Sequence, residues 1–385
     1  MNRFTLKRIA FAFNSLYTKA LNRAVYFLYY KNYRLYLRKQ NIPNKPAQLE
    51  NEWVEKWAVL QKPSRAQYRV FAHYIGANLN IVPEDVSHNI IEPILNPVRY
   101  RFYYEDKNLY DKIFPTEYTA ETLIRKMNGF YYDAGYNRIE KLTDAILLQK
   151  VSRFDKILIK PTVDSASGLG IVLFERVHDG RYIRINGTEE LTVEYLQNNR
   201  GDNFILQECL RQSPFMARFN KTSVNTLRLC AYRSIKDDRC LIPSAIIRMG
   251  GGGSLVDNAH AGGVFVGINS NGRLGKYATT DSADYIPLHN GICFESEDIV
   301  IPNFEKVKEF AAKVITCVPH HRLFALDIMI DENNNPRLIE FNISGFSVWL
   351  YQFAISTVFG EHTDEIIEYC VQHKNEAGKV FMKFV

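Results

Sequence analysis

Two carboxylates and one amide near the end of the chain have the types and spacing of oxygen ligands for a metal ion. Asp327 lies in the apolar run FALDIMI, and Glu340 and Asn342 lie two residues apart in the next run, LIEFN. Side chains alternate along a strand, so Glu340 and Asn342 share a face, and pairing of the two runs would place Asp327 opposite them. Oxygen ligands without histidine or cysteine suit Mg²⁺ bound through nucleotide phosphates. The alternative is that the acids simply end strands and the asparagine begins a turn.

A lysine and a loop of small residues form a second candidate for nucleotide chemistry. Lys160 follows an apolar run in ILIKPTVDSASGLGI, and the loop after it contains Ser167 and Gly168. Backbone N–H groups of such a loop can approach phosphate oxygens while the lysine supplies positive charge. The spacing of a P-loop is absent, and a glycine- and serine-rich hairpin turn explains the loop equally well.

The run NFILQECL is a third candidate. It contains Glu208, an acid expected at a strand end and flanked by backbone amides, and such a position can bind the edge of an adenine ring. This segment becomes informative only together with the other two.

The elements that must hold these residues follow from the pattern of the chain. Residues 1–100 read as helices broken by prolines, and residues 105–130 are expected to form another helical pair. From about residue 155 short β runs and turns take over, and the last candidate ligands lie on two strands joined by an Asp/Asn/Pro turn. Helices are predicted in NFEKVKEFAAKVI, which has an apolar face, and around VWLYQFAISTVF. A helix-rich part followed by mixed α and β structure predicts an α+β protein.

The composition is that of an ordinary globular chain. Its 385 residues are 46% hydrophobic and 23% charged, enough for two or three domains. No apolar stretch approaches the about 18 residues of a spanning helix, and no signal peptide is expected. Six cysteines occur without a CxxC motif. This argues against a zinc ribbon or a thioredoxin-like motif and predicts unpaired thiols in a reducing cytoplasm.

Positive charge and aromatic residues are concentrated at the start of the chain. The first forty residues carry nine Lys and Arg, and no acidic residue precedes Glu50. Helical spacing places Phe4, Ile9 or Phe13, Leu16, Ala20 and Phe27 roughly on one face. Such a helix either packs its aromatic face on the body of the protein or lies on an anionic membrane, here the inner face of the cell membrane. Nucleic acid binding is not expected, because the excess charge is modest and no recognition motif accompanies it.

Together and in this order, the segments resemble the ATP-grasp superfamily, and within it the sugar-transfer-associated branch related to α-L-glutamate ligases. The branch is indicated by SVNTLRL, by IIRMGGGGSLVDNAHAGG and by ALDIMI with RLIEFN. The resemblance covers about residues 105–360. It implies an α+β ATP-grasp fold, in which two α+β subdomains grip ATP, after an N-terminal helical extension. The helical segment is expected over 1–100 and the ATP-grasp domain over 101–385, with a lid at about 155–210.

The resemblance also implies roles for individual residues. It assigns Lys112, Lys160, Ser167, Gly168, Gln207, Glu208 and Leu210 to the nucleotide, Arg228 and Arg248 to the transferring phosphoryl group and the intermediate, Asp257 and Asn258 to the substrate, and Asp327, Glu340 and Asn342 to magnesium. One departure is Leu169, which stands between glycines where many relatives carry a lysine or arginine. The alternatives are snorkelling strand arginines and an ordinary Asp-Asn turn.

These roles imply an enzyme that uses ATP and Mg²⁺. The expected reaction activates a carboxylate as an acyl phosphate, which an amine then attacks, and it needs no side-chain nucleophile. The branch implies a small-molecule or glycan-precursor substrate in cell-surface polysaccharide assembly. A kinase that phosphorylates a sugar-like hydroxyl would use the same nucleotide site, and the sequence does not separate the two.

Overall fold

The computed structural model describes residues 3–163, 169–253, 257 and 262–377, which fall into two compact units. Unit 1 comprises Met1–Arg101, Arg218–Ile328 and Glu340–Val385, and unit 2 comprises Phe102–Ala217 and Met329–Ile339. The chain thus passes between the units at 101/102, 217/218, 328/329 and 339/340, the last two times within strands. Each unit is described by itself.

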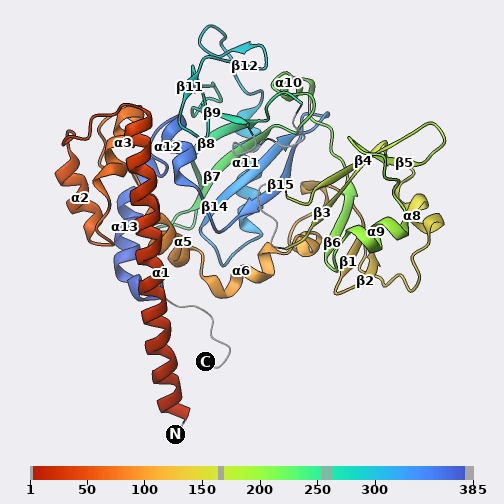
Figure 1. Ribbon diagram of the computed structural model, residues 1–385, viewed down its shortest axis with the longest axis horizontal. Helices are drawn as coiled ribbons and strands as arrows, with labels where there is room; N and C mark the ends of the chain where they lie inside the picture. Colours follow the sequence, from red (N-terminus) through yellow and green to blue (C-terminus); the bar gives the residue numbers. More distant parts are fainter. Residues whose placement is uncertain (1–2, 164–168, 254–256, 258–261, 378–385) are drawn as a thin grey trace. The chain divides into compact units, whose positions relative to one another are not determined.

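A seven-stranded sheet forms the centre of unit 1 (Figure 1), in the order β11-β10-β9-β8-β7-β14-β15. Its strands are β7 (Thr226–Arg233), β8 (Cys240–Met249), β9 (Val264–Ile268), β10 (Ala278–Thr279), β11 (Tyr285–Ile286), β14 (Leu323–Ile330) and β15 (Pro336–Asn342). A short separate pair consists of β12 (Leu288–His289) and β13 (Ile292–Cys293). The predicted strands FALDIMI and LIEFN are therefore confirmed as β14 and β15, and they pair as expected.

Helices cover both faces of this sheet. α11 (Phe304–Thr316) packs against β7 and β8 on one face, and α12 (Val348–Ala354) packs against β8 and β9 on the other. α3 (Arg65–Ile75) lies on α12, and α1 (Arg3–Lys39) lies on α3. The remaining helices that begin in this unit are α2 (Glu50–Ala58), α4 (Glu84–Val86), the π-helix η1 (Ser87–Ile91), α5 (Glu92–Leu95), α6 (Val98–Glu105), η5 (Gly360–His362), α13 (Thr363–Gln372) and η6 (Lys374–Glu376).

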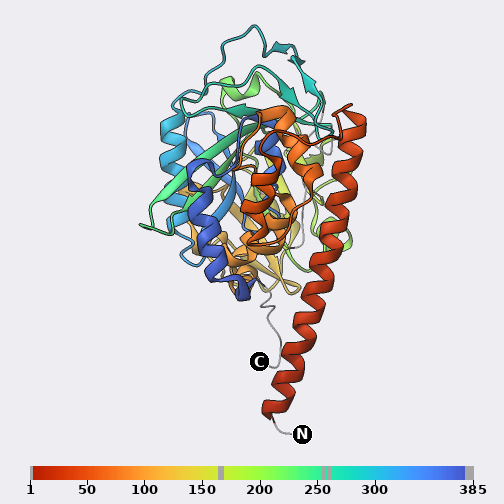
Figure 2. The ribbon, with the colours of Figure 1, turned by 90° about the vertical axis from the view of Figure 1, so that its left-hand side faces the viewer.

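α1 differs along its length. In its carboxyl-terminal part Tyr33 and Leu37 are buried, and the Tyr33 hydroxyl donates a hydrogen bond of 2.7 Å to Glu84. Its amino-terminal part extends beyond the other elements of unit 1 (Figure 2). Within the described residues, no helix combines the length and the apolar character needed to cross a bilayer.

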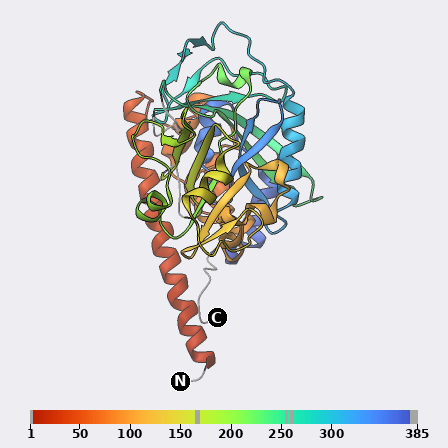
Figure 3. The same cartoon turned by 90° about the vertical axis from the view of Figure 1, so that its right-hand side faces the viewer.

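An antiparallel six-stranded sheet in the order β2-β1-β6-β3-β4-β5 forms unit 2. Its strands are β1 (Thr122–Met127), β2 (Phe130–Asp133), β3 (Lys156–Pro161), β4 (Val172–Arg176), β5 (Tyr182–Arg184) and β6 (Phe204–Glu208). α8 (Asp144–Val151) and α9 (Val193–Asn199) cover one face (Figure 3), where their apolar side chains pack on Ile157, Ile159 and Leu206. The short helices are η2 (Lys107–Leu109), α7 (Tyr110–Ile113), η3 (Thr116–Tyr118) and α10 (Pro214–Ala217).

Candidate functional site

Four charged side chains meet on the face of the unit 1 sheet that also carries α12. Register places Arg228 opposite Asp327 and Thr226 opposite Arg248, so the predicted arginines and the predicted metal ligand share one face. Arg228 donates to both oxygens of Asp327, at 2.8 and 2.7 Å, and Arg248 Nη1 lies 3.2 Å from Asp327 Oδ2. We call Arg228, Arg248, Asp257 and Asp327 the arginine–carboxylate cluster.

The arginines keep Asp327 ionised although it is only 5% exposed. Burial by itself would raise the pKa of Asp327, but Arg228 and Arg248 hold that pKa below its usual value. The paired geometry argues against side chains that merely snorkel from a strand, because both guanidinium groups turn to buried carboxylates rather than to water.

Asp257 belongs to this cluster rather than to an exposed turn. Its carboxylate accepts hydrogen bonds from Thr226 Oγ1 and, at 3.0 Å, from Arg248 Nη2. Burial raises the pKa of Asp257, Arg248 opposes this rise, and nearby Asp327 adds to it. Arg248 is thereby held between two carboxylates, which fixes its direction. Asn258, its predicted partner, lies outside the described residues.

The start of the glycine run is firmly held. Gly250 O accepts hydrogen bonds of 3.0 Å from both Asn220 Nδ2 and Asn290 Nδ2, and a ring nitrogen of His289 lies 3.1 Å away. Asn220 fixes this backbone twice, because its Nδ2 also donates to Gly251 O at 2.9 Å. The glycine run therefore begins at a fixed point directly after β8.

The two other predicted metal ligands lie at the end of β15, next to β14. Asn342 donates through Nδ2 to Ala325 O at 3.3 Å, and the same nitrogen lies 3.5 Å from Asp327 Oδ2. Its amide oxygen is thereby left to act as an oxygen ligand, and Glu340 is half-buried on the same strand. An ionised carboxylate, a second carboxylate and an amide oxygen fit Mg²⁺. No group of three or more Asp, Glu, His or Cys suited to a metal occurs among the described residues.

One residue near the cluster was not singled out from the sequence. Tyr351, on α12, is fully buried, and its hydroxyl has no hydrogen-bond partner among the described residues. Burial raises the pKa of Tyr351 well above its usual value, and the charges of Arg228 and Asp327 also act on it. The side chain is thus a neutral phenol beside a charged centre. Only its packing reveals it, because an aromatic residue in an apolar helix gives no sequence signal.

In unit 2, two predicted nucleotide residues share a face of the sheet. Register pairs Lys160 with Ile205 and Leu158 with Gln207, so Lys160 and Gln207 lie on the face opposite that of α8 and α9. Gln207 Nε2 donates to Ala120 O at 3.2 Å and to Thr122 Oγ1 at 3.3 Å. Gln207 Oε1 is buried without a hydrogen-bond partner among the described residues. A buried, unpaired acceptor of this kind suits a ligand that donates.

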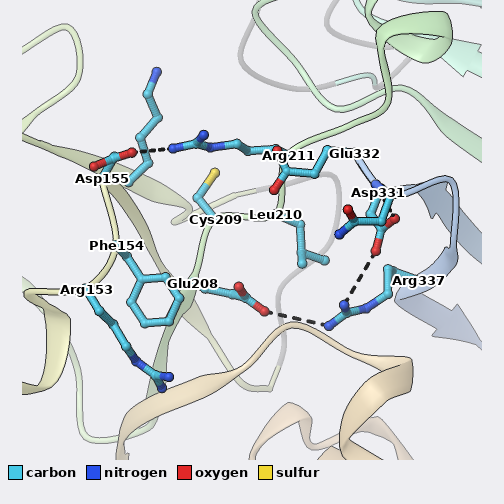
Figure 4. A pocket seen from close by; sticks show the side chains of 12 residues that line it. Arg153, Phe154, Asp155, Glu208, Cys209, Leu210, Arg211, Asp331, Glu332 and Arg337 are labelled. Carbon is cyan, nitrogen blue, oxygen red and sulfur yellow. Dashed lines mark hydrogen bonds and ion pairs between the residues drawn. The ribbon is translucent and has the colours of Figure 1, made fainter.

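Glu208 and Leu210 line a pocket of about 360 Å³ within unit 2 (Figure 4). Lys156 and Cys209, opposite one another at the end of β3, also line it and share the face of Gln207 and Lys160. Arg337 lies 3.7 Å from Glu208 and 3.6 Å from Asp331. The other arginines of the lining are also ion-paired, Arg153 with Glu121 and Arg211 with Asp155. The pocket is therefore polar without excess positive charge.

The structure says less about the predicted nucleotide contacts of Lys112 and of the small-residue loop that contains Ser167 and Gly168. Lys112 lies on α7 with its ammonium group 4.3 Å from the centre of the Tyr136 ring. Ser167 and Gly168 lie outside the described residues. Just after them, Leu169 is 71% exposed, and Gly170 has a φ of 78° and approaches Pro161 so closely that a Cβ would lie 2.7 Å from its Cγ. A glycine is therefore required at the end of this loop.

Comparison with solved structures gives several ATP-grasp enzymes at low identity. The ATP-grasp ligase PsnB with minimal precursor, Mg and ADP is 12% identical, with 72% of this chain and 62% of that chain covered and a TM-score of 0.37. D-alanine–D-alanine ligase from Bacillus anthracis is 15% identical, with 71% and 69% covered and a TM-score of 0.37. N5-carboxyaminoimidazole ribonucleotide synthetase from Thermotoga maritima is 9% identical, with 71% and 51% covered and the same TM-score. The chain spans 59–63% of the length of the first three structures matched.

The family comparison is decisive for the fold. A search of curated proteins found no significant match. The model of a family described as sugar-transfer associated ATP-grasp matches residues 92–367, well over half of the chain. The matched range contains the arginine–carboxylate cluster, the two strands with the predicted metal ligands, and the run that ends in Glu208. The chain therefore has the α+β ATP-grasp fold and belongs to the sugar-transfer associated ATP-grasp family.

Proposed function

We propose that the protein is an ATP- and Mg²⁺-dependent ligase that joins a carboxylate to an amine. The carboxylate oxygen would attack the γ-phosphorus of ATP, forming an acyl phosphate and releasing ADP. The amine nitrogen would then attack the carbonyl carbon, and phosphate would leave with the pair of electrons of the broken C–O bond. The amine loses a proton in this step. Neither step requires a nucleophile from the protein, so positioning and charge stabilisation are the work of the side chains.

The observation that carries the proposal is the arginine–carboxylate cluster. Arg228 is fixed by Asp327 on the neighbouring strand β14, and Asp327 and Asp257 together orient Arg248. Guanidinium groups that are already oriented stabilise negative charge in a transition state without reorganisation. We assign them to the transferring phosphoryl group and to the oxygen of the tetrahedral intermediate.

Magnesium fits the neighbouring oxygen set. Asp327, Glu340 and Asn342 would hold it, and the ion would neutralise charge on the phosphates. Both oxygens of Asp327 already accept hydrogen bonds from Arg228, so they are not free to bind a cation in this arrangement. Entry of a cation therefore requires that an arginine turn from Asp327 to another anion, and the phosphates of the nucleotide are suited to receive it.

The nucleoside end is assigned to unit 2. The unpaired Oε1 of Gln207 would accept a hydrogen bond from the exocyclic amine of adenine. The neighbouring pocket at Glu208 and Leu210 carries no unpaired arginine, which favours an uncharged base or sugar there rather than phosphate. Lys160, further along β3 on the same face, is assigned to the phosphates.

The proposed substrate class follows from the family. Its description as associated with sugar transfer supports a glycan precursor that carries a carboxylate, in the assembly of cell-surface polysaccharide. We therefore choose uronic acids and amino sugars or amino acids as the first substrates for an assay.

The test is to incubate the full chain with ATP, Mg²⁺ and pairs of candidate acids and amines, and to identify products by mass spectrometry. An amide together with ADP and phosphate supports a ligase. A phosphorylated alcohol with ADP identifies a kinase of the same fold instead. Arg248→Gln is the matched variant: the amide product should disappear, while binding of a non-hydrolysable ATP analogue should weaken less. If the wild type does not bind the analogue with Mg²⁺, the proposed function is wrong.

A further inference from the structure

We propose that the outward face of α1 is a docking surface for an anionic lipid bilayer. The outward face is formed by the exposed apolar residues Phe13, Leu16, Tyr17, Leu21, Phe27 and Leu28. The proposal does not depend on the reaction assigned above.

The geometry of α1 separates this face from the face that packs. The inward face recurs at helical spacing through Tyr26, Tyr29, Tyr33, Tyr36 and Leu37, all half-buried or buried. The inward face is anchored by polar contacts as well: Asn89 Nδ2 donates to Asn22 O at 3.3 Å, and the Tyr36 hydroxyl donates to Asp281 O at 2.8 Å. The helix is thus held on one side only.

The outward face is far more exposed than packing on the body would allow. Phe13 is 69% exposed, Leu16 is 64% exposed, and Leu28 is 56% exposed. At 1.5 Å per residue, the stretch from Phe13 to Leu28 is about 24 Å long. A continuous apolar stripe of this size on a helix marks an interaction surface rather than scattered surface residues.

The positive charge around this apolar stripe favours an anionic bilayer as its binding partner. Lys19, Arg23, Lys31 and Arg34 are exposed on the same helix, and the first forty residues contain no acid that would balance them. A second copy of this helix would bring like charges together, which disfavours a self-paired coiled coil. An anionic bilayer neutralises the charges and buries the aliphatic and aromatic side chains at the boundary of headgroups and acyl chains. The exposed Phe and Tyr rings are typical of that interface.

Vesicle sedimentation with the full chain tests the surface. We expect binding to phosphatidylcholine vesicles that contain about 30 mol% phosphatidylserine, weak binding to phosphatidylcholine alone, and loss of binding as salt rises from about 0.1 M to about 1 M. The triple variant Leu16→Gln, Leu21→Gln, Leu28→Gln should lower the partition coefficient at least about tenfold, because each substitution removes apolar burial. Lys19→Gln with Arg23→Gln should lower it chiefly at low salt.

A matched control carries the same chemical change elsewhere on unit 1. Val59, Leu288 and Val371 are 52%, 58% and 46% exposed, so Val59→Gln, Leu288→Gln and Val371→Gln remove similar apolar surface away from α1. This variant should bind vesicles as the wild type does. Circular dichroism of all variants checks that the fold is kept.

Several results would overturn the proposal. They are equal binding by both triple variants, equal binding to neutral and anionic vesicles, and no binding by the wild type. Analytical ultracentrifugation supplies another: a dimer of the wild type that the Leu16, Leu21 and Leu28 variant abolishes would identify a second copy as the occupant.

Discussion

The helical layer beneath α1 and the face of the sheet that carries the arginine–carboxylate cluster bury polar groups in opposite ways. In the helical layer, Glu84 accepts a hydrogen bond from Tyr33, and Gln352 exchanges two hydrogen bonds with the backbone of Val82. On the sheet face, the Tyr351 hydroxyl has no partner among the described residues. In this comparison, the buried groups that join the helical layer to its neighbours have hydrogen-bond partners within the protein, whereas the hydroxyl beside the charged cluster has none among the described residues.

The two regions also hold their acids in different protonation states. Burial raises the pKa of Glu84 to about 7, even though Tyr33 and His88 act to lower it. Asp327 is equally buried, but Arg228 and Arg248 lower its pKa. Glu84 is therefore largely a neutral hydrogen-bonding group below pH 7, whereas the arginines favour the ionised form of Asp327. Unpaired atoms alone do not mark a site, because Ser64 Oγ in the helical layer is also buried without a hydrogen-bond partner among the described residues.

Asp327→Asn should have the largest effect. From the sequence we expect this variant to lose ATP turnover and to keep its fold. The ion pairs of Asp327 add the expectation that the variant is also less stable. Removing the charge leaves Arg228 and Arg248 buried without it, so we expect a loss of about 3–5 kcal/mol of unfolding free energy in urea.

The control for this variant is Asp155→Asn. Asp155 also pairs with two arginines, Arg176 and Arg211, but it is exposed, so its loss should change stability little. Equal stability of Asp327→Asn and the wild type would mean that the cluster is not sealed from water.

Glu84→Gln should reveal a pH dependence that Asp327 lacks. The folded-state pKa of Glu84, about 7, lies above the usual 4.5, so its contribution is fully present below pH 4.5 and is lost as pH rises through 7. A shift of this size corresponds to about 3 kcal/mol. We expect urea unfolding to show that, between pH 5 and pH 8, the free energy of unfolding of the variant rises relative to that of the wild type by up to this amount. A difference that stays constant with pH would contradict the neutral state of Glu84.

The variants Tyr351→Phe and Tyr232→Phe each remove one buried hydroxyl. That of Tyr351 has no hydrogen-bond partner among the described residues, whereas that of Tyr232 has one. Tyr232 is buried below the same sheet face and donates to Glu365 at 2.8 Å, so Tyr232→Phe should cost about 1–3 kcal/mol. Tyr351→Phe should leave stability unchanged or slightly higher. It should lower ATP-dependent phosphate release about tenfold, the effect of one lost hydrogen bond to a charged group. If Tyr351→Phe is the less stable variant and keeps full activity, the hydroxyl serves the fold.

Gln207→Met should have the smallest effect, confined to the nucleotide. It removes the acceptor proposed for adenine, and calorimetric titration with a non-hydrolysable ATP analogue should show up to about tenfold weaker binding. A guanine analogue should lose no affinity, because its exocyclic carbonyl does not donate. Gln67→Met in the helical layer is the counterpart: Gln67 bonds to Glu84 N and Asp85, so this variant should lose stability and keep nucleotide affinity.

The sequence predicted the strands and helices that carry the candidate site residues better than it predicted which side chains those residues contact. β14, β15 and α11 match the predicted runs because their alternating and helical patterns of apolar residues are regular. β1 was missed, since residues 105–130 were read as helical. That strand places Arg125 in a fully buried position, where Asp111 pairs with it, so no alternation is visible in the sequence.

The hydrogen-bond and ion-pair partners of a residue depend on strand register and tertiary packing, and the order of residue types along the sequence does not reveal either. Arg228 was assigned from the resemblance, but its pairing with Asp327 follows from which strands are neighbours. Likewise, the sequence predicted one helical face through Phe4, Ile9 or Phe13, Leu16, Ala20 and Phe27, with two possible roles. The side chains of Phe4 and Ile9 lie outside the described residues, whereas the other four residues are exposed and a second aromatic face of α1 does the packing.

The passage of the chain between the two units has a consequence during synthesis. Unit 2 needs residues 329–339, and the helices near the start of the chain share a core with α12 and α13, which are made last. At about 5–20 residues per second, α3, on which α1 lies, follows α1 within seconds, but α12 and α13 leave the ribosome tens of seconds later. The outward face of α1 is exposed throughout this interval. A membrane that binds this face, as proposed above, could therefore hold the nascent chain before unit 1 is complete.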